Sequence, residues 1–172
     1  PVGPIVCSSD SAFARARTDC ALTREDGALW YDDQGQAWLD PTDPEVLRYL
    51  TALCKECGEL GFDEVLLDSF CYPTGGDTAA IANDDGDRAQ ILTDVAKSLR
   101  SCLPEGVALS GASGGGGDLT LAQLAALFAR IYVPAADYDA AAAQLDSQFD
   151  ADTRLVSITG QATGTGSYML VQ

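Results

Sequence analysis

The chain contains no histidine among its 172 residues. This absence excludes Ser-His-Asp and Cys-His catalysis, and it excludes every zinc site that depends on imidazole ligands. The acid–base groups left for chemistry are the carboxylates of Asp and Glu. We expect no cofactor and no metal ion at a functional site.

Positive charge is also scarce, because 10 Lys and Arg residues face 26 Asp and Glu residues and give a formal net charge of −16. A surface of this sign repels phosphate backbones, so we expect no binding of nucleic acid. No apolar run approaches the roughly 20 residues that a membrane helix needs, so we expect no membrane span. The N-terminus, PVGPIVCSSD, lacks the regions of a signal peptide and starts without Met, as a piece of a longer protein would.

Cysteine is too sparse for a disulfide scaffold in a chain of this length, although the count of 6 is even. Cys54 and Cys57 form a C-x-x-C pair inside a predicted helix, whereas a thioredoxin-type pair opens a helix after a strand. No second pair stands at zinc spacing. We interpret the pair as core or boundary packing, with a redox or metal role as the alternative, and the redox compartment stays open.

The hydrophobic content of 47% is enough for a core of ordinary size, and the length predicts a single domain over residues 1–172. Apolar residues at steps of three and four predict a helix over residues 43–60. Thr42 and Glu45 predict a capping box at its start, and Gly61 suits the position past its end.

The remaining segments alternate between strand and helix patterns. Such alternation predicts an α/β fold, in which a mostly parallel sheet is covered by crossover helices as an open doubly wound sheet or as part of a barrel. The predicted strands are 4–7, 64–68, 106–111, 130–133, 155–159 and 167–171, and the further predicted helices are 11–21, 88–103, 119–129 and 138–145.

The stretch GFDEVLLDSFCYPT places acidic residues in and around an apolar run that reads as a buried strand. Burying an unpaired carboxylate is costly, so these acids indicate a site unless they lie in solvated loops. Glu64 and Asp68 share one face of the strand, whereas Asp63 stands at its start, where a solvated or capping role is expected. Asp68 lies at the carboxyl end of the strand, where ligands bind in parallel α/β folds.

Residues 27–74 resemble the core segment of the bacterial putative glycosyl hydrolase domain family. In that family a Trp-containing turn and an Asn-or-Asp-Pro pair lead into a helix, then into a Leu-Gly-Phe-Asp-Glu strand that closes on an Asp-Tyr-Ile-Arg-Phe-Pro motif. The earlier stretch PIVCSSDSAFARA is more weakly similar to the preceding family strand and its Asp, here Asp10. The matching residues are Trp38, Asp40, Pro41, Glu45, Val46, Tyr49, Leu60, Gly61, Phe62, Asp63, Glu64, Asp68 and Pro73.

The resemblance implies a (β/α)8 barrel, distantly related to the alpha-amylase clan, and an activity on carbohydrate. It aligns this chain with roughly the last six strands, so we expect a partial or open (β/α) TIM-barrel-like domain with mostly parallel strands, the C-terminal two-thirds of a family barrel. Three explanations stay open: an N-terminal segment completes the barrel, the sheet is open, or a partner chain in a homo-oligomer completes it. The resemblance also favours an extracytoplasmic or cell-surface location.

Glycoside hydrolysis needs two carboxyl groups on either side of the scissile bond. The first candidate is Asp68, as nucleophile or stabiliser, and its partner is Asp10, after the first strand, or Glu64, deeper on the strand of Asp68. The alternatives are a buried Asp68 held by loop amides and an Asp10 that caps the following helix. Where the family has Tyr and Arg after the strand-end Asp, this chain has Ser69 and Cys71, so the cation that would orient Asp68 is missing.

Aromatic side chains commonly line ligand pockets. Tyr72, Tyr132, Trp38 and Phe70 lie in or near strand ends or βα loops, so they are the candidate substrate-binding residues, with core or rim packing as the alternative. We expect a carbohydrate ligand there.

Two other stretches resemble ligand loops in composition alone. SGASGGGGDLT lacks the Lys of a Walker loop and the Gly spacing of a dinucleotide fingerprint, which favours a flexible βα loop. NDDGDR lacks the terminal Glu of a calcium loop and predicts a solvated turn that caps the helix from Arg88.

These observations predict a glycoside hydrolase-like protein that acts on carbohydrate through carboxylate acid–base chemistry. The alternative is a non-catalytic carbohydrate-binding or interaction module, favoured by the lost Tyr-Arg pair and the shortened barrel. Two carboxyls about 5 to 10 Å apart across an open cleft would favour hydrolysis. An Asp68 locked by amides, with no cleft, would favour the alternative.

Overall fold

The computed structural model describes residues 1–113, 117–145, 148–160 and 167–170. Within these residues, six strands form one sheet in the order β1-β2-β3-β4-β5-β6, and each pairs in parallel with the next. This confirms the α/β class with parallel strands. The strands are β1 (Val2–Val6), β2 (Glu64–Asp68), β3 (Ala108–Ala112), β4 (Ile131–Pro134), β5 (Leu155–Thr159) and β6 (Ser167–Leu170).

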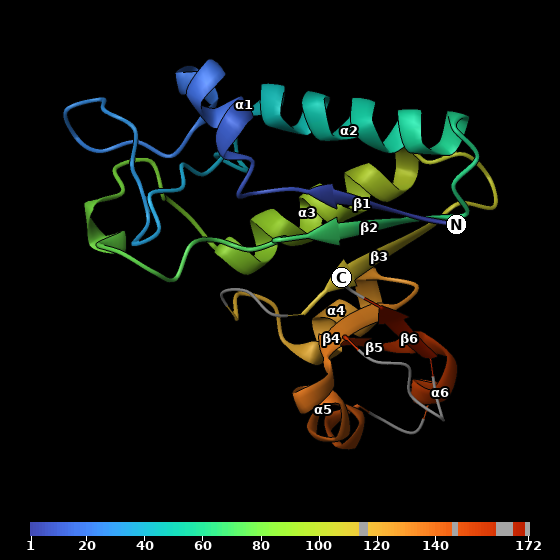
Figure 1. Cartoon of the computed structure of the whole chain (residues 1–172). Coiled ribbons are helices and arrows are strands. Elements are labelled where there is room, and N and C mark those ends of the chain that lie inside the picture. The colour runs from blue at the N-terminus through green and yellow to red at the C-terminus, as the bar shows by residue number, and fades with distance from the viewer. Residues whose placement is uncertain (114–116, 146–147, 161–166, 171–172) are drawn as a thin grey trace.

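The helices follow the strands as crossover connections (Figure 1). In the described part of the chain, none is long and apolar enough to cross a membrane. The helices are α1 (Ser11–Ala16), α2 (Pro44–Glu59), α3 (Arg88–Cys102), α4 (Leu121–Leu127), α5 (Tyr138–Gln144) and α6 (Ala151–Arg154).

Local side-chain caps fix where the two long helices begin. The carboxylate of Asp43 accepts a hydrogen bond from the Glu45 amide at 2.7 Å and caps α2. The predicted capping box is therefore wrong, because the Thr42 hydroxyl donates to Asp40 instead. The Asp87 side chain caps α3 in the same way by accepting from the amide of Gln90, as the acidic turn before this helix predicted.

Three helices differ from the sequence expectation. α1 ends at Ala16 rather than at residue 21, because the chain turns into a short 3-10 segment, Thr18–Cys20. α4 covers Leu121–Leu127 rather than residues 119–129, and it begins after Thr120, which forms a capping box with Gln123. The short helix α6 was not predicted, since a single turn carries no helical periodicity.

One face of the sheet packs against the helices and forms the main core. Val65 and Leu67 of β2 are fully buried there, together with Leu50 of α2 and with Leu92 and Leu99 of α3. Because side chains alternate along a strand, this packing forces Glu64, Leu66 and Asp68 onto the opposite face.

The opposite face carries a smaller apolar cluster. Leu66, Tyr132 and Val156 are buried in it, and Met169 of β6 packs partly buried against them. Val6, on the outermost strand β1, is 44% exposed. Since β1 and β6 are not paired with each other in the described residues, the sheet is open and corresponds to part of a barrel.

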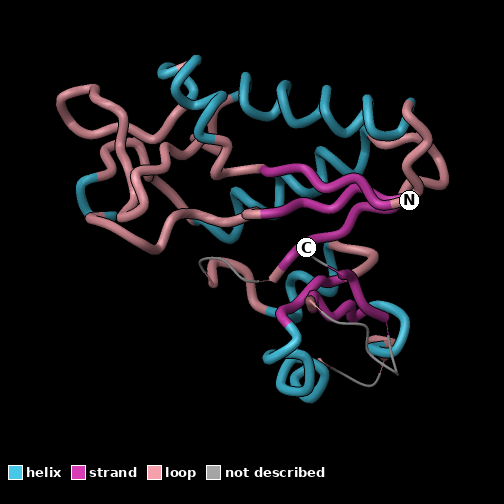
Figure 2. Tube along the Cα trace, viewed as in Figure 1, coloured by secondary structure: helices cyan, strands magenta, loops and turns pink. Residues whose placement is uncertain are grey.

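Two long loops follow β1 and β2 and lie side by side beyond the carboxyl ends of these strands (Figures 1 and 2). Bridges between Ala21 and Leu39 and between Tyr31 and Ala37 fold the first loop back on itself. The second loop contacts it through a hydrogen bond of 2.7 Å from the Ala82 amide to the Thr23 carbonyl. These contacts hold the two loops together, and the loops form the rim above the strands.

The Cys54-Cys57 pair lies on the sheet side of α2. Cys54 is fully buried, and burial raises the pKa of its thiol to about 12. The Cys57 sulfur sits 3.2 Å from the position that a Cβ on Gly3 of β1 would occupy. Thiolates are the reactive and metal-binding form of cysteine, so this environment favours packing over redox or metal chemistry for the pair.

Gly111 of β3 allows close packing of a buried aromatic ring. A Cβ at this position would lie 2.6 Å from the ring of Phe128, which is 1% exposed. We expect Gly111→Ala to lower the free energy of unfolding by about 1–3 kcal/mol, because neither β3 nor the buried ring has room to move. Urea unfolding followed by circular dichroism measures the change.

The matched control is Gly160→Ala. Among the described residues, no atom lies within 4 Å of a Cβ built at Gly160, so this variant should unfold near the wild-type urea concentration. Equal stability of the two variants would contradict the packing role of Gly111.

Candidate functional site

Asp68 stands at the carboxyl end of β2 with its side chain exposed. One carboxylate oxygen accepts a hydrogen bond of 2.8 Å from the amide of the next residue, Ser69. Ser69 itself adopts a left-handed backbone with φ 52°. Such a conformation costs roughly 1 kcal/mol in a residue with a Cβ, and backbone strain of this kind clusters at functional sites.

An open cleft of about 310 Å³ lies in front of Asp68, and we call it the rim cleft. Four of the residues singled out from the sequence meet there: Asp68, Trp38, Phe70 and Tyr72. The rest of the wall is Ser69, Cys71, Thr74, Ala112, Ser113, Pro134 and Ile158.

The aromatic residues of the rim cleft are mostly packed under its surface. Trp38 is 9% exposed, Phe70 7% and Tyr72 2%. The exposed side chains at the cleft are Asp68, Thr74 and Pro134. The aromatic rings therefore shape a firm wall, and the carboxylate of Asp68 is the charged group that a ligand meets first.

An arginine and two aspartates fix the position of Tyr72 on the side away from the rim cleft. The Arg88 guanidinium lies 4.7 Å from the centre of the Tyr72 ring, a cation–π distance, and it pairs with the carboxylates of Asp84 and Asp118. Asp118 also accepts a hydrogen bond of 2.8 Å from the Tyr72 amide. Burial, followed by the nearby Asp84 and Asp40 charges, raises the pKa of the Tyr72 phenol, so the ring stays neutral at physiological pH.

Asn83 fastens the two long loops together. Its Nδ2 donates to the Asp40 carboxylate at 2.8 Å and to the Ala21 carbonyl at 3.1 Å, while its Oδ1 accepts from the Thr23 amide at 2.8 Å. Asp40 is 9% exposed and also accepts from the Thr42 amide. The buried Asp40 carboxylate thus accepts hydrogen bonds from residues of both loops.

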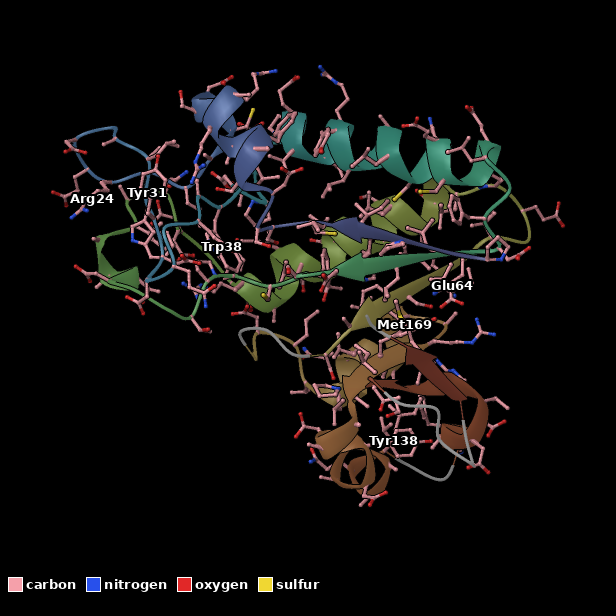
Figure 3. All side chains as sticks on the ribbon, viewed as in Figure 1. Arg24, Tyr31, Trp38, Glu64, Tyr138 and Met169 are labelled. Atoms are coloured by element: carbon pink, nitrogen blue, oxygen red, sulfur yellow. The ribbon has the colours of Figure 1, made fainter. Side chains whose placement is uncertain are left out.

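The two tryptophans are fixed by the same loops. The Trp38 indole nitrogen donates to Asp32 at 3.0 Å, and the Trp30 indole nitrogen donates to the Asp77 carbonyl at 2.8 Å. Both rings belong to a small cluster with Leu22. Figure 3 shows Trp38 within this loop lobe.

A second hollow of about 290 Å³ adjoins the rim cleft, and we call it the side pocket. It lies between the loop after β3, α4 and α5. Phe70, Cys71, Ala112 and Ser113 line both hollows, so the two share part of their wall. Leu121 and Leu124 of α4 and Ala140, Ala141 and Gln144 of α5 line the side pocket together with Gly117, Asp118, Leu119, Val133 and Asp137.

Asp10, a predicted partner of Asp68, is not among the residues that line the rim cleft. Its Oδ1 accepts from the Phe13 amide at 3.0 Å and caps α1, and its Oδ2 accepts from the Tyr49 hydroxyl at 2.7 Å. Burial and this hydrogen bond raise the pKa of Tyr49 to about 12. The geometry supports the capping alternative for Asp10.

Glu64 and Tyr132 also lie outside the rim cleft. Glu64 starts β2, so it faces the amino end of the sheet, and Figure 3 shows it far from Trp38. Its carboxylate is 5% exposed, pairs with Arg130 at 2.5 Å and accepts from the Tyr132 hydroxyl at 3.1 Å. Burial and the Glu64 charge raise the pKa of Tyr132 to about 12.

These contacts separate Glu64 and Tyr132 from the rim cleft, and their catalytic and sugar-binding roles stay predictions. The Tyr132 ring points toward the amino end of the sheet, where its hydroxyl meets Glu64, rather than toward the rim. The two residues cross-brace β2 and β4 on the face away from the helices.

A family model described as a putative glycosyl hydrolase domain matches residues 1–110, which is most of the chain. The chain belongs to this family. The match covers β1, β2 and the first three residues of β3, together with both long loops and the helices α2 and α3. The rim cleft draws most of its wall, including Asp68, from this matched region.

Solved structures share the fold. A hypothetical protein from Ruminiclostridium thermocellum is 27% identical, with a TM-score of 0.54 over 64% of this chain and 56% of its own. The α-galactosidase TtGalA from Thermus thermophilus is 18% identical, with a TM-score of 0.50 over 72% of this chain and 24% of its own. Ega3 from Aspergillus fumigatus, solved with galactosamine, is 14% identical, with a TM-score of 0.56 over 91% and 59%.

The chain thus spans less than two thirds of the length of each of these structures. These likenesses confirm a partial (β/α) barrel of TIM-barrel type for this member of the family. No curated protein matches the chain.

Sequence reasoning missed Asn83, Arg88 and Asp118 as parts of the site. Each reaches the rim through contacts with residues far away in the chain, such as Asp40 and Tyr72. The acidic neighbours of Asn83 favour a solvated turn. Its side chain offers both donors and acceptors, but nothing in the sequence links it to its partner Asp40, 43 positions away.

We expect Glu64→Gln to destabilise the protein by about 1–3 kcal/mol, because it removes the charge from a buried, hydrogen-bonded pair. The rim cleft should keep its ligand affinity. Urea unfolding and a binding assay measure the two properties.

Asp63→Asn provides the matched control for this change. Its carboxylate is 78% exposed, so the substitution should cost less than about 1 kcal/mol. A stable Glu64→Gln protein that has lost ligand binding would contradict the bracing role.

We expect Asn83→Ala to loosen the loop pair, because it leaves the Asp40 carboxylate with fewer donors at a cost of about 1–3 kcal/mol. Tryptophan fluorescence should shift to the red as Trp30 and Trp38 gain contact with water. Gln34→Ala removes an exposed carboxamide from the first loop and should leave the spectrum unchanged. An unchanged Asn83→Ala spectrum and stability would show that the loops hold together without this residue.

Proposed function

We propose that the rim cleft binds carbohydrate and that Asp68 is the carboxylate that acts on the sugar, as nucleophile or charge stabiliser in glycoside hydrolysis. The observation that carries this proposal is an exposed carboxylate at the carboxyl end of a parallel strand, in an open cleft of about 310 Å³. This is the place where (β/α) barrels hold their ligands.

Three further features support a sugar as the ligand. The family is described as a putative glycosyl hydrolase domain, and the fold is shared with an α-galactosidase and with a protein that was solved with galactosamine. The cleft wall combines apolar surface with hydroxyl groups of Ser69, Thr74 and Ser113, which suits the mixed character of sugar rings.

The chemistry of Asp68 fits this task. A carboxylate at the rim can attack the anomeric carbon or stabilise the positive charge that develops there. The hydrogen bond from the Ser69 amide occupies Oδ1 and, among the described residues, leaves Oδ2 available. The group is also exposed, so no buried partner has to be displaced before a sugar arrives.

A second candidate function is carbohydrate binding without hydrolysis. Among the described residues that line the rim cleft, Asp68 is the single carboxylate. Hydrolysis also needs a general acid to protonate the leaving oxygen. The predicted partner Asp10 caps α1 instead, and the family Arg after the strand is Cys71 here.

A screen of aryl glycosides and of a glycan array separates the two functions. With hydrolysis, wild-type protein releases the aryl group, and Asp68→Asn lowers kcat/KM by at least roughly a hundredfold. With binding alone, no aryl group is released, and Asp68→Asn weakens glycan binding.

Asp63→Asn is the matched control, since it removes an identical charge from the opposite end of the same strand. It should behave as wild type in both assays. Unchanged activity and binding in Asp68→Asn would reject the role of Asp68 in either function.

A further inference from the structure

The charged residues that line the two adjoining hollows are all of one sign. Asp68 lines the rim cleft, and Asp118 and Asp137 line the side pocket. No Lys or Arg is among the described residues that line either hollow. The site therefore presents carboxylates without a lining cation.

The three carboxylates differ in how far they are already neutralised. Asp118 is 8% exposed, lies 3.6 Å from the Arg88 guanidinium and accepts from the Tyr72 amide, so its charge is largely compensated. Asp68 and Asp137 are exposed, and within the described part of the chain neither has a cation within 4.0 Å. Two uncompensated carboxylates thus face the hollows.

The charge of the whole molecule reinforces this local field. The formal net charge is −16, and clefts with low-dielectric walls focus a field of one sign. The apolar residues of the side pocket, such as Leu121, Leu124 and Val133, form a wall of this kind. An anionic glycan would be repelled, and a cationic glycan would be drawn in.

We infer that the ligand is a positively charged, amine-bearing glycan, such as an oligomer of de-N-acetylated hexosamine. One sugar unit meets Asp68 in the rim cleft, and the ammonium group of a neighbouring unit meets Asp137 in the side pocket. This inference rests on the proposed function of the rim cleft and adds the substrate class. Asp137 serves here as a binding residue, because it recognises charge at a distance from the reacting bond.

The adjacency of the hollows supports such a ligand. Their volumes of about 290 and 310 Å³ are each those of a small ligand site, and Phe70, Cys71, Ala112 and Ser113 line both. A ligand made of linked sugar units can therefore place one unit in each of two neighbouring hollows.

Isothermal titration calorimetry at about pH 6, where the amines are protonated, tests the inference with three oligomers of equal length. They are a hexosamine oligomer, its fully N-acetylated form and an oligomer of uronic acid. We expect the amine oligomer to bind at least roughly tenfold more tightly than the acetylated one, the uronic acid oligomer not to bind, and the difference to shrink when salt rises from about 0.05 to about 0.5 M.

The decisive variant is Asp137→Asn, which should weaken binding of the amine oligomer roughly tenfold and leave the acetylated oligomer unaffected. Glu105→Gln is the matched control: it removes the same charge from an exposed turn before β3, at the opposite end of the sheet, and should change neither affinity.

The outcomes separate this inference from the proposed function. Equal affinity for amine and acetylated oligomers, or an Asp137→Asn protein with wild-type preference, overturns the amine-bearing ligand while carbohydrate binding stands. An equal loss in Asp137→Asn and Glu105→Gln also overturns it, because the net charge alone would then account for the effect. Absence of binding to every oligomer and to the glycan array overturns the proposed function itself.

Discussion

The burial of Val65 and Leu67 beneath α2 and α3 is the constraint on which the site depends. Because side chains alternate along a strand, packing these two residues against the helices places Asp68 on the opposite face of the sheet. The parallel register with β1 and β3 then places the carboxyl ends of three strands at one edge. A shift of one residue in the register of β2 would turn the Asp68 carboxylate toward the helices. The pairing of β2 with its neighbours therefore specifies both the core and the site.

The rim is built by contacts between loops that are distant in sequence. Asp40 would be costly to bury alone, and Asn83 supplies it with a donor from the second loop. Tyr72 is similarly fixed by Arg88, which begins α3, and by Asp118, which precedes α4. The Asp40 carboxylate thus obtains a donor from the connection after β2, and the Tyr72 amide finds its acceptor in the connection after β3. These contacts fix irregular backbone around the cleft.

Local patterns predicted most of the elements, and they also predicted Asp68 at the rim, because periodicity and strand ends are properties of neighbouring residues. They did not place Glu64 and Tyr132 side by side and away from the rim, because the stagger of β4 along β3 is set by tertiary packing: Gly111, near the end of β3, pairs with Ile131 at the start of β4. Nor does a sequence show that a tyrosine ring will reach across β3 to a glutamate 68 positions away. Asn83 was missed for the same reason, since its partners lie on another loop.

The two acids at the ends of β2 show how the fold treats charge. Glu64 is buried and has Arg130 and Tyr132 as partners, so its desolvation is offset within the protein. Asp68 is exposed, and water solvates it until a ligand covers the cleft. A ligand that covers the cleft removes this water, and its own polar groups must replace the hydrogen bonds that the Asp68 carboxylate loses. The fold therefore neutralises the acid at one end of β2 within the protein and leaves the acid at the other end open to solvent or to a ligand.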